Sequence, residues 1–507
     1  MSKTTQEQIN RVLWEAADTF RGKIDSSIYK DYILVKLFVK YMSDVHKERY
    51  AIYEDRYDGN EERIERAMSR ERFVLEETST FDYLYSERTN PEIGVLINKA
   101  LGNIEDTNAT KLRGVFRNID FNSEAVLGST RERNTMLRNV LEDFNKLDLR
   151  PSKLEDEDII GNAYQYMIEQ FASDAGKKGG EFFTPPMVSE LLARLVEPQE
   201  NDRIYDPTCG SGSLLIRVVD KVPNRKVAIY GQERNGQTHS LAKMNMFLNN
   251  IDDARIEWGD TIANPLHLDD EGYLMKFQRI VANPPFSLAK WAEGFAGEGE
   301  ERFRMQAELD PFRRFDWGVP PASRGDMAFV QHMLASLAEG GTMATILPHG
   351  VLFRGAAEKR IREAFIKMNY LHAVIGLPEA LFYGTGIPAC ILVFKKGRPE
   401  KDVLFIDASG EEYFEKGSNR NFLREEDVAR IYDTYKNYET IDKYAYVASL
   451  DEIVENDYNL NIPRYVDTFE EEEPVDMEQV AKNIKEIKTE IAEVEDKMEK
   501  YLKELGL

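Results

Sequence analysis

The chain has 507 residues, of which 42% are hydrophobic and 11% aromatic. This length suggests about three domains, and this composition excludes a disordered or fibrous protein. Two cysteines, Cys209 and Cys390, are too few for a disulfide framework or a thiolate zinc site. With 66 basic and 90 acidic residues the net charge is −24, so any DNA contact must be local or made through a partner.

Residues 1–150 are predicted to form an all-helical domain. Apolar residues recur there at helical spacing, as in Ile9, Leu13, Ala16, Ala17 and Phe20. The N-terminus has no apolar signal core. Charged residues interrupt the most apolar early stretch, which is therefore no membrane span. We expect a cytoplasmic protein that does not contact the membrane.

Residues 151–470 are predicted to form a doubly wound α/β domain with a mostly parallel sheet. Short apolar runs alternate with helical spacing, which is typical of βαβ units. The predicted strands are 203–206, 227–233, 255–260, 277–283, 342–347, 373–377 and 390–394. Helical spacing fills the gaps, for example at 327–337 and 358–368. Ligands of such sheets bind beyond the carboxyl ends of the strands, so the residues that follow each run are the candidate site.

Residues 471–507 are predicted to form a C-terminal helical, coiled-coil-like tail. Steps of four and three separate Val480, Ile484, Ile487, Ile491, Val494, Met498, Tyr501 and Leu505. Such a heptad seam needs a partner helix. The partner is either the helical N-terminal domain of the same chain or another subunit.

Three strand ends carry carboxylates around a small-residue turn. Asp206 ends the first strand and is followed by Thr208, Gly210, Ser211, Gly212 and Ser213, where the glycines let the backbone approach a ligand. Glu233 ends the second strand, where ribose hydroxyls are recognised in this architecture. Asp260 follows the third strand and can accept a hydrogen bond from an adenine amino group. Taken alone, such a turn is also an ordinary strand-to-helix junction.

The fourth strand ends in Asn283, Pro284, Pro285 and Phe286. Two consecutive prolines lack amide donors, so the chain must leave the sheet with its carbonyls available. The Asn283 side-chain oxygen and the Pro284 carbonyl can both accept from an exocyclic amine, while Phe286 stacks on the ring. This arrangement makes a nucleobase amine nucleophilic.

Together with Gly180, Glu181, Phe182, Phe183, Thr184 and Pro185, these motifs resemble the S-adenosylmethionine-dependent amino methyltransferases of DNA. The helical front and the run at 459–465 are similar to the modification subunit of type I restriction-modification systems. The resemblance implies that 180–185 and 206–213 hold the methionine end of S-adenosylmethionine. It also implies that Glu233 binds the ribose, Asp260 the cofactor adenine, and residues 283–286 a flipped target adenine, which is methylated on N6.

The resemblance further implies double-stranded DNA as substrate and a separate specificity subunit that chooses the sequence. It implies a second copy of this chain and a separate restriction subunit that acts as motor and nuclease. Two alternatives are an RNA or protein-glutamine methyltransferase with the same Asn-Pro-Pro turn, and a non-catalytic assembly subunit.

Other polar residues favour structural roles. His239, His332, His349 and His372 lack metal-ligand spacing, so no metal is expected. Cys209 is expected to pack rather than react. The long connection 287–326 carries Arg302, Phe303, Arg304, Arg313, Arg314, Phe315 and Trp317, and a second basic group comprises Arg354, Lys359, Arg360 and Arg362. Both are predicted to be surface groups, with DNA contact as the alternative.

Overall fold

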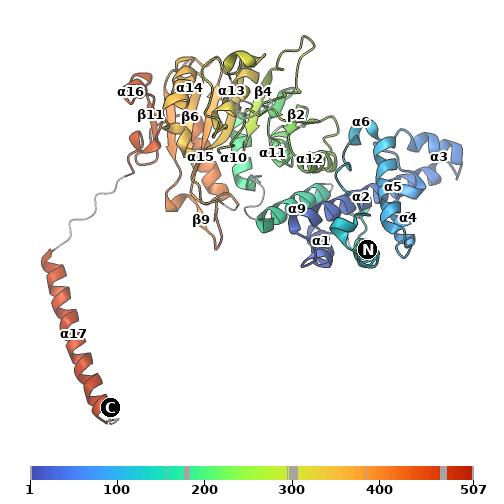
Figure 1. Ribbon diagram of the computed structural model, residues 1–507, viewed down its shortest axis with the longest axis horizontal. Coiled ribbons are helices and arrows are strands. Elements are labelled where there is room, and N and C mark those ends of the chain that lie inside the picture. The colour runs from blue at the N-terminus through green and yellow to red at the C-terminus, as the bar shows by residue number, and fades with distance from the viewer. Residues whose placement is uncertain are drawn as a thin grey trace. The chain divides into compact units, whose positions relative to one another are not determined.

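The computed structural model describes residues 3–156, 158–175, 183–293, 295, 306–383, 385–468 and 477–504. The chain divides into two compact units, 1–466 and 467–507. Figure 1 shows the helical N-terminal part and the sheet of the first unit, and the single long helix of the second. Each unit is described by itself.

The N-terminal part of the first unit is helical, as predicted. Its first helix begins with a capping box in which Thr5 and Gln8 each accept from the other's backbone amide, and it buries the predicted stripe from Ile9 to Phe20. The helices are α1 (Gln6–Phe20), α2 (Ser26–Arg56), α3 (Glu61–Met68), α4 (Phe81–Ser86), α5 (Ile93–Thr107), α6 (Ala109–Leu112), α7 (Glu124–Leu127), α8 (Thr130–Phe144) and α9 (Ile159–Ala175).

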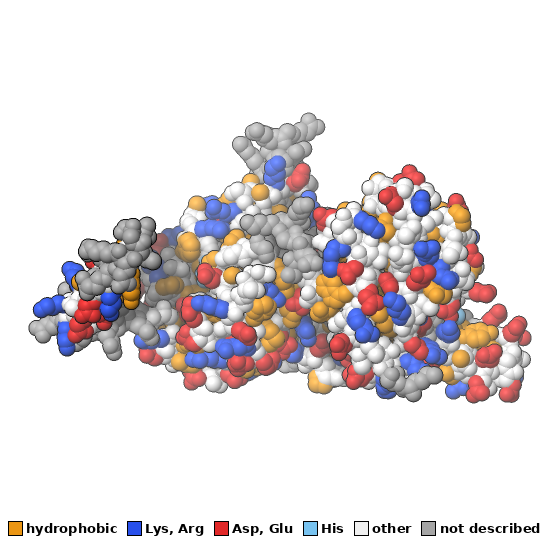
Figure 2. Space-filling view, turned by 90° about the horizontal axis from the view of Figure 1, so that it is seen from below, with side chains coloured by type: hydrophobic (Ala, Val, Ile, Leu, Met, Phe, Trp, Pro, Cys, Tyr) orange, Lys and Arg blue, Asp and Glu red, His pale blue; other side chains and the backbone are white. Residues whose placement is uncertain are grey.

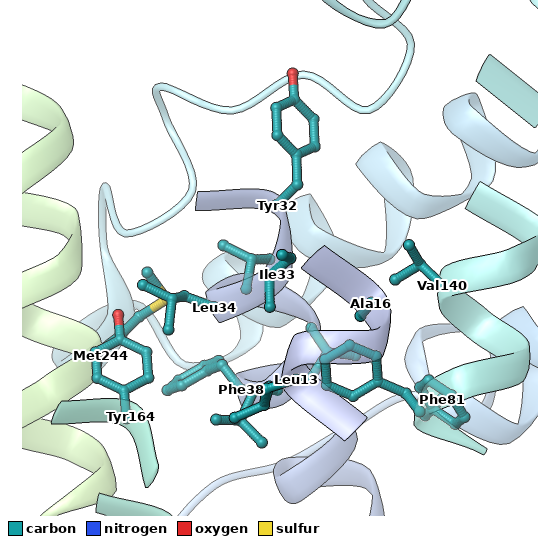
Figure 3. Close-up of a cluster of buried hydrophobic side chains, with 14 of the residues drawn as sticks. Leu13, Ala16, Tyr32, Ile33, Leu34, Phe38, Phe81, Val140, Tyr164 and Met244 are labelled. Carbon is teal, nitrogen blue, oxygen red and sulfur yellow. The ribbon is translucent and has the colours of Figure 1, made fainter. Parts of the chain in front are cut away.

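The core of this helical part continues into the sheet-containing part. Four residues of α12 (Gly236–Leu248) belong to the same buried cluster as α1, α2 and α9: Leu241, Met244, Phe247 and Leu248. Figure 3 shows Met244 and Tyr164 beside Leu34 and Phe38. Outside this core, Arg72 and Lys111 both pair with Asp252 in the loop after α12, the lysine at 3.0 Å.

The predicted α/β architecture is confirmed as a nine-stranded sheet in the order β11-β8-β6-β7-β5-β4-β1-β2-β3. Strands β3, β2, β1, β4 and β5 are parallel to one another, and β6 is parallel to β8. Strands β7 and β11 run antiparallel to their neighbours. The strands are β1 (Arg203–Asp206), β2 (Ala228–Glu233), β3 (Arg255–Trp258), β4 (Phe277–Ala282), β5 (Leu337–Pro348), β6 (Leu371–Gly376), β7 (Ala389–Lys395), β8 (Val403–Asp407) and β11 (Ala445–Ala448).

Helices cover both faces of the sheet. Successive strand residues point to opposite faces, and each face belongs to a different buried cluster. In β5, Ala344 and Ile346 lie in the cluster with α10, α11 and α15, whereas Met343 and Leu347 lie in the cluster with α13 and α14. A small hairpin of β9 (Glu415–Lys416) and β10 (Asn421–Phe422) stands apart. The covering helices are α10 (Pro186–Val196), α11 (Ser213–Val219), α13 (Asp326–Ser336), α14 (Ala356–Lys367), α15 (Glu425–Asn437) and α16 (Leu450–Glu455).

The second unit contains α17 (Met477–Glu504), which has the predicted apolar seam. The described seam side chains of Ile484, Ile487, Ile491, Val494, Met498 and Tyr501 are 49–64% exposed. Val480 and Leu505 lie outside the described side chains. None of the described helices is at once long and apolar enough to cross a membrane.

Candidate functional site

A cavity of about 430 Å³ lies at the carboxyl edge of the sheet, bordered by the segments that follow β1, β2, β3 and β4. Sheets of this topology bind ligands at that edge, and the volume is that of a small-molecule site. The predicted site residues that line it are Phe183, Thr184, Asp206, Thr208, Gly210, Ser211, Ser213, Glu233, Asp260, Asn283 and Pro285.

The turn after β1 owes its shape to two left-handed glycines, Gly210 at φ +53° and Gly212 at φ +78°. Gly210 lines the cavity, as expected for a close backbone approach. Gly212 instead faces α12, where an added Cβ would stand 2.6 Å from the Met246 methyl carbon. Gly212 is not among the described lining residues, and the absence of a Cβ there lets the turn pack against α12. Asn245 of α12 fixes the same turn by donating to the Ser211 carbonyl at 2.9 Å.

Asp206 and Glu233 face the same turn. Asp206 is 2% exposed and accepts from the Thr208 amide at 2.9 Å. Burial, reinforced by the charge of Glu233, raises the pKa of Asp206 to about 7. Glu233 accepts from the Gly210 amide at 3.0 Å and from the Asn235 amide at 2.7 Å. The two carboxylates thus lie close enough to repel each other, and a bound cation would relieve that repulsion.

Asp260 is held by its own chain. Its Oδ1 accepts from the amides of Ile262 and Ala263 at 2.9 and 3.0 Å, and its Oδ2 lies 3.3 Å from the Arg234 guanidinium. The next residue, Thr261, donates to the Pro207 carbonyl at 2.5 Å. The third strand end is therefore tied to the turn after β1, and its carboxylate has a fixed direction.

The turn at 283–286 stands beside the segment at 183–185. The Asn283 amide donates to the Thr184 hydroxyl at 3.0 Å. Phe286 is half-buried and meets Phe382 edge to face, with ring centroids 5.7 Å apart. Pro185, Pro284 and Phe286 are not among the described lining residues, although each adjoins one that is.

The segment before α10 is anchored by a polar cluster. The Phe183 ring lies 6.0 Å from the Tyr383 ring. The Tyr383 hydroxyl donates to Glu169 of α9 at 2.7 Å and accepts from Arg420 at 2.6 Å. Gly180, Glu181 and Phe182 lie outside the described residues.

The helical N-terminal part supplies one wall of the cavity, which sequence reasoning missed. Ile28, Lys30, Ile168 and Phe171 line it from α2 and α9. Two of the described lining residues are cations, Lys30 and Arg234, and Arg234 pairs with Asp260. Helical spacing in this part of the sequence carries no signal of a contact with a distant sheet.

The other polar residues have structural contacts. His239, His349 and His372 hydrogen-bond to the Ile256 carbonyl, the Ala389 carbonyl and Arg398, and the buried His332 bonds Tyr205 and Arg314. Burial lowers the pKa of His372 to about 3. Cys209 is buried, and burial raises the pKa of its thiol well above the ordinary value. These contacts agree with the expected structural roles.

The predicted surface role is wrong for Phe315, which is fully buried, and for two arginines. Arg314 has a fully buried side chain that pairs with Asp310 at 2.8 Å and donates to the Ile262 carbonyl. It therefore connects the loop at Asp310 to the segment that follows β3. Arg362 is 2% exposed and donates to three backbone carbonyls. Arg302, Phe303 and Arg304 lie outside the described residues.

On the face seen in Figure 2, acidic and basic side chains interleave.

Two family models match the chain. The model described as N-6 DNA Methylase matches residues 155–474, and the model described as HsdM N-terminal domain matches residues 9–144. The MpnII methylase subunit of a type I restriction enzyme from Mycoplasma pneumoniae is 33% identical over 96% of this chain and 95% of its own length. The chain belongs to the type I restriction enzyme methylase subunits.

Further comparisons agree with this family. The MjaVIII methylase subunit of Methanocaldococcus jannaschii is 30% identical, over all of this chain and 86% of that relative. The crystal structure of the type I restriction-modification methyltransferase subunit from Streptococcus thermophilus is 34% identical, with a TM-score of 0.79, over 92% of this chain and all of that one. This methylase subunit is therefore an N6-adenine DNA methyltransferase of a restriction-modification system, as the sequence motifs predict.

Proposed function

We propose that the cavity binds S-adenosylmethionine and an adenine extruded from double-stranded DNA, and that residues 283–286 present the adenine N6 to the methyl donor. One observation carries this proposal. The Asn283 amide, held by Thr184, lines the same cavity as the carboxylates of Asp206, Glu233 and Asp260. The one cavity therefore has acceptors for the amine of the target adenine and acceptors for the nucleoside of the methyl donor.

The described residues fit this donor. Glu233 would accept from the ribose hydroxyls and Asp260 from the adenine amino group of the donor. The turn comprising Asp206, Thr208, Gly210, Ser211 and Ser213, together with Phe183 and Thr184, would hold its methionine end. Gly180, Glu181 and Phe182 are proposed to complete that end of the site. When bound, S-adenosylmethionine supplies a methyl group on a sulfonium, which is already a good leaving group.

The chain's own task is then to position and orient the amine. The Asn283 side-chain oxygen and the Pro284 carbonyl accept the two N6 hydrogens, which turns the nitrogen lone pair toward the donor. The Asn283 amide nitrogen donates to Thr184 at 3.0 Å, and the side-chain oxygen is the atom that would accept from the base. Phe286 stacks on the purine, and Pro285 excludes water from its edge. The N6 proton leaves as, or after, the new bond to carbon forms.

The same proposal includes partners. The relatives are named as subunits of type I restriction enzymes, so this chain would act with a specificity subunit, a second copy of itself and a separate restriction subunit. The charge of −24 and the interleaved charges of Figure 2 agree with sequence choice by another chain. The exposed seam of α17 provides a surface for such an assembly.

The decisive experiment uses the chain reconstituted with its specificity subunit, methyl-labelled donor and an adenine-containing duplex that is then digested to nucleosides. We expect label in N6-methyl-2′-deoxyadenosine, and a loss of at least about 100-fold in the Asn283→Ala variant, because removing an oriented acceptor in the transition state costs that much. Asn224→Ala changes an exposed loop residue and is the matched control. Label in RNA or protein, or an Asn283→Ala rate equal to that of the control, would refute the proposal.

A further inference from the structure

The residue that follows the turn at 283–286 has an unfavourable backbone conformation. Ser287 lies at φ +51°, a left-handed conformation that a side chain with a Cβ disfavours. Its amide donates to Asp326 Oδ1 at 2.7 Å, and its hydroxyl donates to Asp326 Oδ2 at 3.4 Å. Such backbone conformations persist where the surrounding structure over-determines them, and here the Asp326 carboxylate is the group that does so.

Asp326 is held in turn by an arginine. It is 1% exposed, and its Oδ2 accepts from Arg354 at 3.2 Å. Arg354 also reaches Glu358 at 3.4 Å. The buried Arg362 donates to the Arg354 carbonyl at 2.6 Å and to the Tyr458 carbonyl at 3.2 Å. The segment that carries Arg354 is therefore fixed to α14 and to the start of the 459–465 run.

Stability alone is a poor explanation for this arrangement. Burying charges is costly, and apolar residues of similar size pack as well or better. What apolar residues cannot do is accept from the backbone amide of Ser287. The carboxylate therefore specifies the direction in which the chain leaves Phe286.

We propose that Asp326, supported by Arg354, is a positioning residue for adenine methylation. It holds Ser287 in the left-handed conformation and thereby sets Phe286 and Asn283 toward the extruded base. The inference rests on the proposed roles of residues 283–286. Neither Asp326 nor Arg354 is among the described residues that line the cavity, so both act through the turn and not by touching the donor.

The test measures steady-state methylation by the reconstituted complex. We expect Asp326→Ala and Arg354→Met to lower kcat by about 10- to 100-fold, since a misplacement of about 1 Å costs about 100-fold. The KM for S-adenosylmethionine should stay within about twofold, because the donor is bound elsewhere in the cavity. Lys359→Met is the matched control, because Lys359 lies five residues after Arg354 and its ion pair, at 2.5 Å with the exposed Asp457, does not involve Ser287.

Asp326→Asn keeps the side-chain volume and serves if the alanine variant does not fold. We expect it to lower kcat less than alanine, because one oxygen can still accept from the Ser287 amide.

A double-mutant cycle separates positioning from a general structural effect. In an Asn283→Ala background, Asp326→Ala should cost less than about threefold, because residues that act as one unit are not additive.

Two results would overturn the inference: fully additive losses in the cycle, or a kcat for folded Asp326→Asn and Arg354→Met equal to that of Lys359→Met. A wild-type complex that leaves adenine unmethylated would refute the proposed function instead. The two failures are therefore distinguishable.

Discussion

Asp206 is expected to stabilise donor binding at the expense of the stability of the fold. Its carboxyl has an ordinary pKa of 3.8 in the unfolded chain, and burial together with Glu233 raises the pKa to about 7 in the folded one. Between these values the folded protein binds the extra proton, so stability falls as the pH rises from 3.8 to 7. The loss is complete above pH 7 and amounts to about 4 kcal/mol.

The Asp206→Asn variant removes this cost and keeps an oxygen that can accept from the Thr208 amide, which now stands at 2.9 Å. We expect the free energy of unfolding at pH 8 to rise by about 2 to 4 kcal/mol, and the gain to vanish near pH 4. Thermal and urea unfolding at both pH values measures it. Asp270→Asn, which changes an exposed carboxylate in a turn between β3 and β4, is the control.

Donor binding should change in the opposite direction. A carboxylate that becomes charged near pH 7 attracts the ammonium and sulfonium of S-adenosylmethionine. In the wild type the Kd should therefore rise by up to about tenfold for each pH unit below 7. The variant should bind weakly and without pH dependence between about pH 5.5 and 8.5. Calorimetric titration that gave equal Kd values for both proteins at pH 8, or no gain in stability there, would refute the reasoning.

Three further predictions concern single side chains. Thr184→Val keeps the shape but removes the acceptor of the Asn283 amide, so kcat should fall about tenfold while unfolding shifts by less than about 1 kcal/mol; an unchanged kcat would contradict the orienting role. Lys36 is buried over the Phe121 ring, and burial lowers its pKa from 10.5 to about 7. Because the unfolded chain binds the extra proton between these values, stability rises with pH from 7 to 10.5. Lys36→Met should therefore stabilise the protein by a few kcal/mol at pH 6 but not at pH 11. Urea titrations at both pH values measure this difference. Gly212→Ala should cost about 1–3 kcal/mol through overpacking against Met246, and Met246→Ala should recover part of that cost in thermal unfolding.

The sequence predicted the elements whose signal is local. The strand that ends at Asp206 and the strand that ends before Asn283 are both short apolar runs followed by turn residues, and both lie within one residue of their predicted ends. Strands β8 and β11 were missed. β8 is fully buried but follows β7 with no helix between them, and β11 is a four-residue strand at the edge of the sheet. The antiparallel direction of β7 was not predictable either, since it depends on the loop at 377–388.

The site was predictable to the extent that the sheet topology brings strand ends together. The carboxylates of Asp206, Glu233 and Asp260 do line one cavity with Asn283. Contacts that depend on distant packing were not foreseen, such as Lys30 from the helical part, the burial of Arg314, or the orientation of Gly212 toward Met246. In each of these cases the partner is far along the chain, and the residue type alone favours a different role.

The predicted boundary near residue 150 can be tested through α12. Its Phe247 ring lies 5.3 Å from the Phe38 ring and 5.7 Å from the Phe73 ring, so the helical part buries one face of this helix. A fragment of residues 155–466 would expose that face, and we expect it to aggregate or to unfold at a lower temperature than the full chain. Phe38→Ala in the full chain should cost about 3–5 kcal/mol for the same reason.

Deletion of residues 467–507 is the matched control, because α17 belongs to the other compact unit and its removal should leave the unfolding temperature unchanged. If the 155–466 fragment instead unfolds cooperatively at the temperature of the full chain, the sheet-containing part is stable without the helical part, and the cavity wall formed by Ile28 and Lys30 is not needed for that stability. If the fragment fails, the helical part is required for the cofactor-binding domain to fold. In that case variants in α2 should affect methylation even though they lie far in sequence from every methyltransferase motif.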